Sequence, residues 1–167
     1  MVCVEIKVVK NLEILLNSIV KNKKPKFVNK KIDKTYQLPV VDRSLTDRYR
    51  KKYYYSYRMP CALLKTSFGC PYHCSFCFCT RITNYEYYVR ELEPVMKEIM
   101  DLKEDAIFIV DDNFLVDKER IKAFCDLLDK YDIYKSFYYS ARADYIASNE
   151  DVIELLAAHG FDTVFVG

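Results

Sequence analysis

Glycine is scarce in this chain of 167 residues, which contains only Gly69, Gly160 and Gly167. Dinucleotide-binding loops and Walker A loops need clustered glycines, because their backbone must approach a phosphate group closely. The three glycines of this chain form no such cluster. The sequence therefore excludes a Rossmann-type dinucleotide site and a P-loop nucleotide site.

Long apolar runs are also absent, although 51% of the residues are hydrophobic and 30% are charged. No run of about 18 apolar residues occurs, as a transmembrane helix would require. The segment Met1–Lys7 lacks the basic start and the small-residue cleavage site of a secretion signal. We therefore expect a globular, cytoplasmic protein with its own hydrophobic core and no membrane partner.

Charge is nearly balanced over the whole chain but is unevenly distributed. The formal net charge is +2, yet residues 1–60 carry 15 Lys and Arg against five Asp and Glu, and residues 61–167 carry 11 against 19. A basic N-terminal third is compatible with nucleic-acid binding. It is more often a solvated or domain-docking surface, so we do not expect nucleic acid as a partner.

The first 60 residues show little regular patterning. Val2–Val9 fits a strand and Asn11–Lys21 a short amphipathic helix, so residues 1–24 are interpreted as the remnant of an N-terminal domain. Residues 25–60 lack a clear period and are expected to be a linker on the surface. The tyrosines interleaved with basic residues between positions 49 and 58 could stack on nucleic-acid bases. More commonly, such rings lie on a neighbouring domain.

From Cys61 onward, predicted strands alternate with predicted helices. The strands are expected at residues 62–66, 106–110, 136–141 and 161–166. The helices are expected to open at Glu93 with Pro94 as first residue, at Asp117 as N-cap, and at a capping box formed by Ser148 and Asp151, with Gly160 closing the last. This alternation with short connections is typical of a parallel α/β sheet or barrel.

Cysteine is concentrated in one short segment, with four of the seven cysteines between positions 70 and 79. Cys70, Cys74 and Cys77 have the spacing C-x3-C-x2-C directly after a predicted strand. Thiolates are the usual ligands of iron–sulfur clusters. Three of them from one loop leave one iron of a four-iron cube open to a cosubstrate. The pattern therefore favours a 4Fe–4S cluster on these three residues.

The cysteine spacing has two other interpretations. The positions i, i+4 and i+7 share one face of a helix, but Gly69 and Pro71 flank the first cysteine and argue against a helix interior. A structural zinc site needs four ligands, and Cys79 or His73 could complete it. Zinc ligands usually come as two separated pairs, so zinc stays the less favoured alternative.

The stretch Thr66–Cys77 resembles the cluster loop of radical S-adenosylmethionine (SAM) enzymes, including the aromatic residue before the last cysteine. It is most similar to the radical SAM proteins associated with a cobalamin-binding domain. Leu38–Arg43 resembles their interdomain linker, and Ile109–Phe114 resembles the end of their second barrel strand. Cobalamin is thus possible in the family, but no Asp-x-His cobalamin-ligand motif occurs in this sequence.

The fold that this resemblance implies is an incomplete (β/α)6 partial TIM barrel. About four strand–helix units would lie in residues 61–167, after a linker and a domain remnant. The chain is therefore expected to be shortened at both ends relative to the family.

The resemblance also implies a reaction. A flavodoxin or ferredoxin would reduce the cluster, SAM would be cleaved reductively to a 5′-deoxyadenosyl radical, and methyl transfer through cobalamin is a variant of this chemistry. The residues implied to contact SAM are Phe76 (through its backbone), Asp111, Asp112, Asn113, Ser140 and Arg142. Alternatively, the paired aspartates could bind Mg²⁺ or accept N–H bonds from a turn, and Arg142 could form a structural pair with Asp144.

Two further functions stay open from the sequence alone. One is a tRNA-modifying methylthiotransferase-like enzyme, which uses a similar cysteine loop. The other is a zinc-binding or catalytically inactive fragment. The substrate is not predicted.

Overall fold

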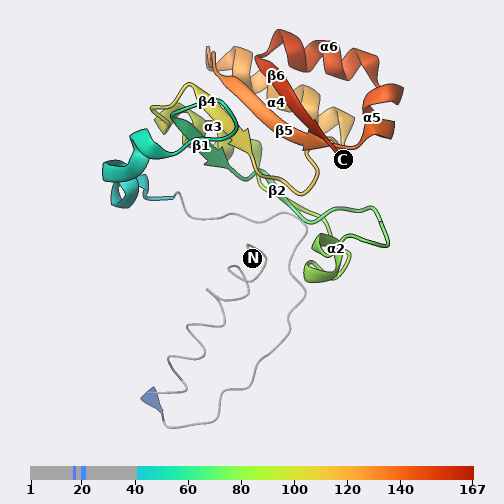
Figure 1. The fold of residues 1–167 in the computed structure, drawn as a ribbon, viewed down its shortest axis with the longest axis horizontal. Helices are drawn as coiled ribbons and strands as arrows, with labels where there is room; N and C mark the ends of the chain where they lie inside the picture. Colours follow the sequence, from blue (N-terminus) through green and yellow to red (C-terminus); the bar gives the residue numbers. More distant parts are fainter. Residues whose placement is uncertain (1–16, 18–19, 22–40) are drawn as a thin grey trace.

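A computed structural model describes residues 17, 20, 21 and 41–167 of the chain (Figure 1). The predicted strand Val2–Val9 and most of the predicted helix Asn11–Lys21 lie outside these residues. The extents of the N-terminal remnant and of the linker therefore stay predictions.

A four-stranded parallel sheet forms the centre of the fold. Its strands are β1 (Cys61–Leu64), β4 (Ala106–Ile109), β5 (Ser136–Ala141) and β6 (Phe161–Val166). They lie in the order β1-β4-β5-β6, and every neighbouring pair is parallel. The four predicted strands and the α/β class are thereby confirmed.

Helices cover one face of this sheet (Figure 1). They are α3 (Leu92–Asp101), α4 (Lys118–Lys130) and α6 (Glu150–Ala158), with the short α5 (Ala143–Ser148) before α6. Ile107, Ile109 and Phe137 on the strands are fully buried against helix residues such as Val95 and Phe124. This apolar layer is the hydrophobic core, and burying each such side chain contributes about 1.5–3 kcal/mol.

The opposite face of the sheet is partly covered by the segment before β1. Leu63, Phe108, Tyr138 and Thr163 form a row in register across the four strands of this face. The ring of Tyr55 stacks on Phe108 with 3.9 Å between ring centroids. This tyrosine of the basic tract thus lies against the sheet, while Leu63, next to Phe108 at the β1 end of the row, is 53% exposed.

Residues 43–52 correct the expectation of a linker without regular structure. They form η1 (Arg43–Lys52), a 3-10 helix that begins after Asp42, whose side chain accepts a hydrogen bond from the Ser44 amide. Arg43 pairs with Glu98 at 2.6 Å and Arg50 pairs with Glu104 at 2.9 Å. No residue of η1 is fully buried, so ion pairs rather than apolar packing hold this helix on the domain.

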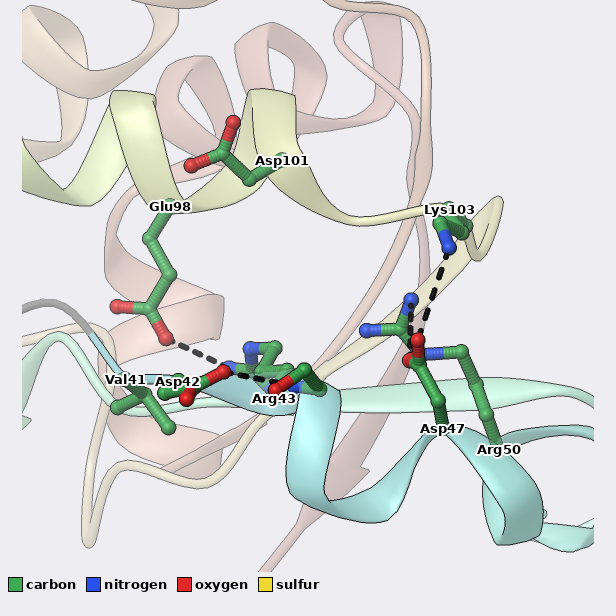
Figure 2. Close-up of a pocket in the computed structure, with 9 residues that line it drawn as sticks. Val41, Asp42, Arg43, Asp47, Arg50, Glu98, Asp101 and Lys103 are labelled. Atoms are coloured by element: carbon green, nitrogen blue, oxygen red, sulfur yellow. Dashed lines mark hydrogen bonds and ion pairs between the residues drawn. The ribbon is translucent and has the colours of Figure 1, made fainter.

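A cavity of about 230 Å³ lies between η1 and α3 (Figure 2). Its walls carry charges of both signs, including Asp47, Arg50 and Lys103, which lie side by side. None of the residues predicted to bind a cluster or SAM lines it.

The helix starts were predicted with mixed success. Asp117 is the N-cap of α4 and accepts hydrogen bonds from the amides of Glu119 and Arg120, as expected. α3 begins at Leu92, with Glu91 as N-cap, two residues before the predicted first residue Pro94.

The predicted capping box at Ser148 is wrong, because Ser148 is the last residue of α5. α6 follows Asn149 instead, whose side chain donates to the Tyr145 carbonyl of α5. The short α5 was not predicted.

Gly160 closes α6 as predicted, at a position where only glycine fits. Its φ is +81°, and a Cβ there would come within 2.2 Å of the Lys135 carbonyl oxygen. The left-handed conformation is strained for residues with a side chain.

Of the helices in the described part of the chain, none has the length and apolar character of a membrane-spanning segment.

His159 connects the end of α6 to α4 and makes stability depend on pH. Burial lowers the pKa of His159, but the Leu155 carbonyl at 2.6 Å and the Asp129 carboxylate at 3.1 Å outweigh it and leave the pKa above its usual value. A raised pKa in the folded state stabilises the fold below the pKa of the unfolded chain, near 6.5. This stabilisation is lost as the pH rises through the pKa of the folded state.

We therefore expect the free energy of unfolding, measured with urea, to fall more between pH 6 and pH 8 in the wild type than in His159→Gln. The control is His73→Gln, which changes the other histidine of the chain and should keep the wild-type slope. Equal slopes for wild type and His159→Gln would contradict the assignment.

Candidate iron–sulfur cluster site

A small antiparallel ladder brackets the cysteine loop. β2 (Ser67–Phe68) follows β1 and pairs with β3 (Tyr88–Val89), so the residues between them form a closed excursion that contains α2 (Cys79–Ile82). This excursion lies beyond the end of β1 (Figure 1). The sequence indicated neither the ladder nor α2.

Gly69 makes the turn into this loop possible. Its φ is +77°, and a Cβ there would lie 2.1 Å from the Glu86 carbonyl oxygen and 2.9 Å from Thr83 Oγ1. The two arms of the loop therefore approach each other where only glycine leaves room. Gly69 fixes the backbone just before Cys70.

Asp111 anchors the root of the loop to the end of β4. Asp111 is 5% exposed, and its carboxylate accepts hydrogen bonds from Thr66 N at 2.7 Å, Thr66 Oγ1 at 2.6 Å and Ser67 Oγ at 2.7 Å. Burial raises the pKa of Asp111, while these hydrogen bonds act in the opposite direction. A buried carboxylate held by three donors is a rigid structural link between two strand ends.

Asp112 holds the next part of the loop. Its Oδ2 accepts the amide of Gly69 at 2.8 Å and lies 3.6 Å from Lys65 Nζ, which also donates to the Val110 carbonyl. The two aspartates thus accept the backbone amides of Thr66 and Gly69, which both precede the first cysteine of the loop. This matches the alternative in which the pair accepts N–H bonds from a turn. SAM binding by either residue stays a prediction.

The three predicted ligand thiols differ in their exposure. Cys70 is buried, whereas Cys74 and Cys77 are partly exposed. Burial raises the pKa of the Cys70 thiol, and the charges of the neighbouring Cys74 and Cys77 raise it further. Arg142 Nη1 donates to Cys74 Sγ at 3.2 Å.

This donor set fits an iron–sulfur cluster, which bonds each thiolate to a different iron. Among the described residues, no three His, Cys, Asp or Glu side chains lie close enough together to hold a single metal ion.

Arg142 connects the end of β5 to the cysteine loop. It forms two hydrogen bonds with Asp144, at 2.9 and 2.6 Å, and its guanidinium lies 4.2 Å from the centre of the Tyr72 ring. The hydrogen bonds to Asp144, with the charges of Asp144 and Cys74, raise the pKa of Arg142. The structural pair with Asp144 is therefore present, and the same side chain reaches the loop.

The remaining predicted site residues lie around the same edge. Asn113 is 3% exposed and directly follows the two aspartates. The Ser140 carbonyl accepts the Phe114 amide at 3.1 Å, which brings the ends of β4 and β5 together. Phe76, just before Cys77, is 90% exposed. Their contacts with SAM stay predictions.

Cys79 and His73 differ from the three ligand candidates. Cys79 begins α2, and burial together with the charges of Asp112 and Cys77 raises the pKa of its thiol to about 11. It is therefore a thiol rather than a thiolate near neutral pH. His73 stacks on the Tyr85 ring with 4.9 Å between centroids.

Lys65, Thr66 and Ser67 were missed as site residues by the sequence reasoning. They hold the loop root through the two aspartates described above. The available signal was the pair of hydroxyl residues between the strand and the glycine, since hydroxyls at a strand end commonly bond nearby carboxylates.

Comparison with known proteins assigns the family. Residues 64–167 match the Radical SAM superfamily. The chain therefore belongs to this superfamily of enzymes, and the predicted resemblance is confirmed.

Named relatives of this chain are methylases. It is 32% identical over 120 residues to the hopanoid C-3 methylase of Methylococcus capsulatus, a match that covers 72% of this chain and 23% of that protein. It is 27% identical over 107 residues to an uncharacterized methyltransferase of Synechocystis sp., covering 59% of this chain and 20% of that protein.

The fold also matches a solved structure. The radical SAM methyltransferase TsrM of Kitasatospora setae, solved with tryptophan substrate and a SAM analog, superposes with a TM-score of 0.66 at 18% identity. The match covers 96% of this chain and 36% of TsrM. At this identity it shows a shared fold. The matched part of the chain spans between a fifth and a quarter of the length of the two curated relatives.

Removing the Asp111 anchor should destabilise the chain. In Asp111→Ala, the amide and hydroxyl of Thr66 and the hydroxyl of Ser67 lose their buried acceptor, so we expect a loss of about 3 kcal/mol in the free energy of unfolding, measured with urea. Asp126→Ala, which changes an exposed carboxylate of α4, is the matched control and should stay within about 0.5 kcal/mol of wild type. A loss equal to that of the control would show that Asp111 does not hold the loop.

Proposed function

We propose that this chain is the catalytic core of a methyl-transferring radical SAM enzyme, with a 4Fe–4S cluster on Cys70, Cys74 and Cys77. The observation that carries this proposal is the loop itself, which presents three thiols and is rooted by Asp111 and Asp112 at the carboxyl ends of parallel strands. Ligands of α/β folds bind at this edge of the sheet. We further propose that the sheet belongs to an incomplete (β/α)6 barrel.

The cluster, when bound and reduced, supplies one electron for cleavage of a carbon–sulfur bond of SAM. The chain itself supplies the three thiolate ligands, orients SAM and excludes water from the site. The groups proposed to face SAM are the Phe76 backbone and the side chains of Asp112, Asn113, Ser140 and Arg142. Asp111 is assigned to the loop root instead, because both of its oxygens already accept hydrogen bonds.

Methyl transfer is supported by the names of the two curated relatives. It is a proposal for this chain, since each relative is several times longer than the matched segment. Cobalamin belongs to the proposal only through the resemblance to cobalamin-associated radical SAM proteins, and no described residue is assigned to it. The electron donor is proposed to be a flavodoxin or a ferredoxin.

A scan of the four loop cysteines tests the cluster. We expect the anaerobically reconstituted wild type to contain iron and sulfide, to absorb at about 400 nm and to release 5′-deoxyadenosine from SAM under dithionite. Cys70→Ala, Cys74→Ala and Cys77→Ala should each lose most of the iron and all SAM cleavage, because each removes one of three ligands. Cys79→Ala is the matched control from the same loop and should keep the cluster.

Two outcomes would contradict this assignment. Zinc without sulfide in the wild type would favour a zinc-binding module. Loss of the cluster in Cys79→Ala would mean that this thiol is a fourth ligand and that no iron is open to SAM.

A further inference from the structure

Asn113 is a buried amide without a hydrogen bond in the described part of the chain. The residue is 3% exposed, and neither Oδ1 nor Nδ2 has a partner there. Buried side-chain amides normally find partners, because an unbonded one lowers stability. An amide left unbonded in the native fold therefore points to a partner that the described chain does not supply.

The neighbours of Asn113 show where this partner lies. The two preceding residues, Asp111 and Asp112, bind the root of the cysteine loop, and the next residue, Phe114, binds the Ser140 carbonyl. Asn113 is thus fixed between the ends of β1, β4 and β5. This is the edge from which the cysteine loop departs.

Of the three candidate ligand cysteines, Cys70 is the most buried, as Asn113 is. It is only 9% exposed, whereas Cys74 and Cys77 are partly open to solvent. Asp112, the residue before Asn113, accepts a hydrogen bond from the amide of Gly69, the residue before Cys70, at 2.8 Å. Asn113 and Cys70 are therefore two buried residues next to the same hydrogen bond.

A second loop sulfur already has a nitrogen donor. Arg142 Nη1 donates to Cys74 Sγ at 3.2 Å. This edge of the sheet thus directs one N–H group, from Arg142 directly after β5, at a sulfur of the loop. Asn113 lies four residues after the end of β4, at the same edge.

We propose that Asn113 Nδ2 donates a hydrogen bond to the Cys70 sulfur when that sulfur carries the cluster, and that this bond raises the reduction potential of the cluster. The inference rests on the proposed function and makes Asn113 a positioning residue rather than a cluster ligand. The sulfur carries more negative charge in the reduced cluster, so an N–H donor stabilises the reduced form more than the oxidised form. Hydrogen bonds to the sulfurs are one of the factors that set cluster potentials.

Asn113→Leu and Asn113→Ala test this inference in two measurements. In the first, the reconstituted cluster is titrated with reductant and its reduced state followed by electron paramagnetic resonance. Both variants should show about a tenfold lower ratio of reduced to oxidised cluster at a given potential, which is about 59 mV for a one-electron couple. Iron and sulfide contents should equal those of the wild type.

The second measurement uses the chain without its cluster. Because the Asn113 amide is unbonded there, Asn113→Leu should unfold in urea at the wild-type midpoint or above it. The matched control is Asn149→Leu, which removes an amide that does donate a hydrogen bond, to the Tyr145 carbonyl at 2.8 Å. That variant should unfold at lower urea and leave the cluster potential unchanged.

Two results would overturn the inference while leaving the proposed function intact. An unchanged potential in both Asn113 variants would show that the amide does not bond the cluster sulfur. A lower urea midpoint for the cluster-free Asn113→Leu chain would show that the amide has a structural partner. Failure of the wild type to bind iron and sulfide is a different result, because it would remove the proposed function itself.

Discussion

The buried carboxylate of Asp111 is the interaction on which the candidate site depends. It joins the end of β4 to Thr66 and Ser67, which lie between β1 and the cysteine loop. The Thr66 carbonyl in turn accepts hydrogen bonds from the Arg90 amide and from Arg120 of α4. The dipeptide Thr66–Ser67 is thus held by Asp111 after β4, by Arg90 after β3 and by Arg120 of α4. Since loops are otherwise the mobile parts of α/β folds, this support lets a loop hold three sulfurs in one arrangement.

The root of the cysteine loop is also connected to η1, the helix that precedes the sheet. Glu98 of α3 is 4% exposed and binds Arg43 of η1 on one oxygen and Arg90 on the other. Arg90 also donates to the Lys65 carbonyl, one residue before Thr66. A buried carboxylate shared by two guanidinium groups is costly to break, typically by about 3–5 kcal/mol when one partner is removed. The position of η1 and the position of the loop root therefore depend on one buried charge.

The parallel sheet could be predicted from the sequence because each strand is a short apolar run between clear helix signals. Phe161–Val166 and Ser136–Ala141 have the predicted bounds, and Asp117 caps α4 because an aspartate before a helix can accept two free amides. The failures have local causes. η1 has no apolar period, since ion pairs hold it. β2 and β3 have two residues each, too short to leave a pattern.

The cysteines of the site could be predicted because their spacing is a property of the sequence, but the distribution of roles among the polar residues could not. Asp111 and Asp112 are adjacent, and only the fold shows that one is buried under three donors while the other is partly open beside Lys65. Arg142 and Cys74 are 68 residues apart, and no periodicity in the sequence predicts their contact. Asn113 is the most instructive case, because burial, which usually indicates a satisfied structural role, here leaves both of its polar atoms without a bond in the described chain. A fold that keeps such an amide next to its most buried loop thiol is less stable than one with an apolar residue there. The proposed hydrogen bond would offset this stability cost when the sulfur acquires negative charge.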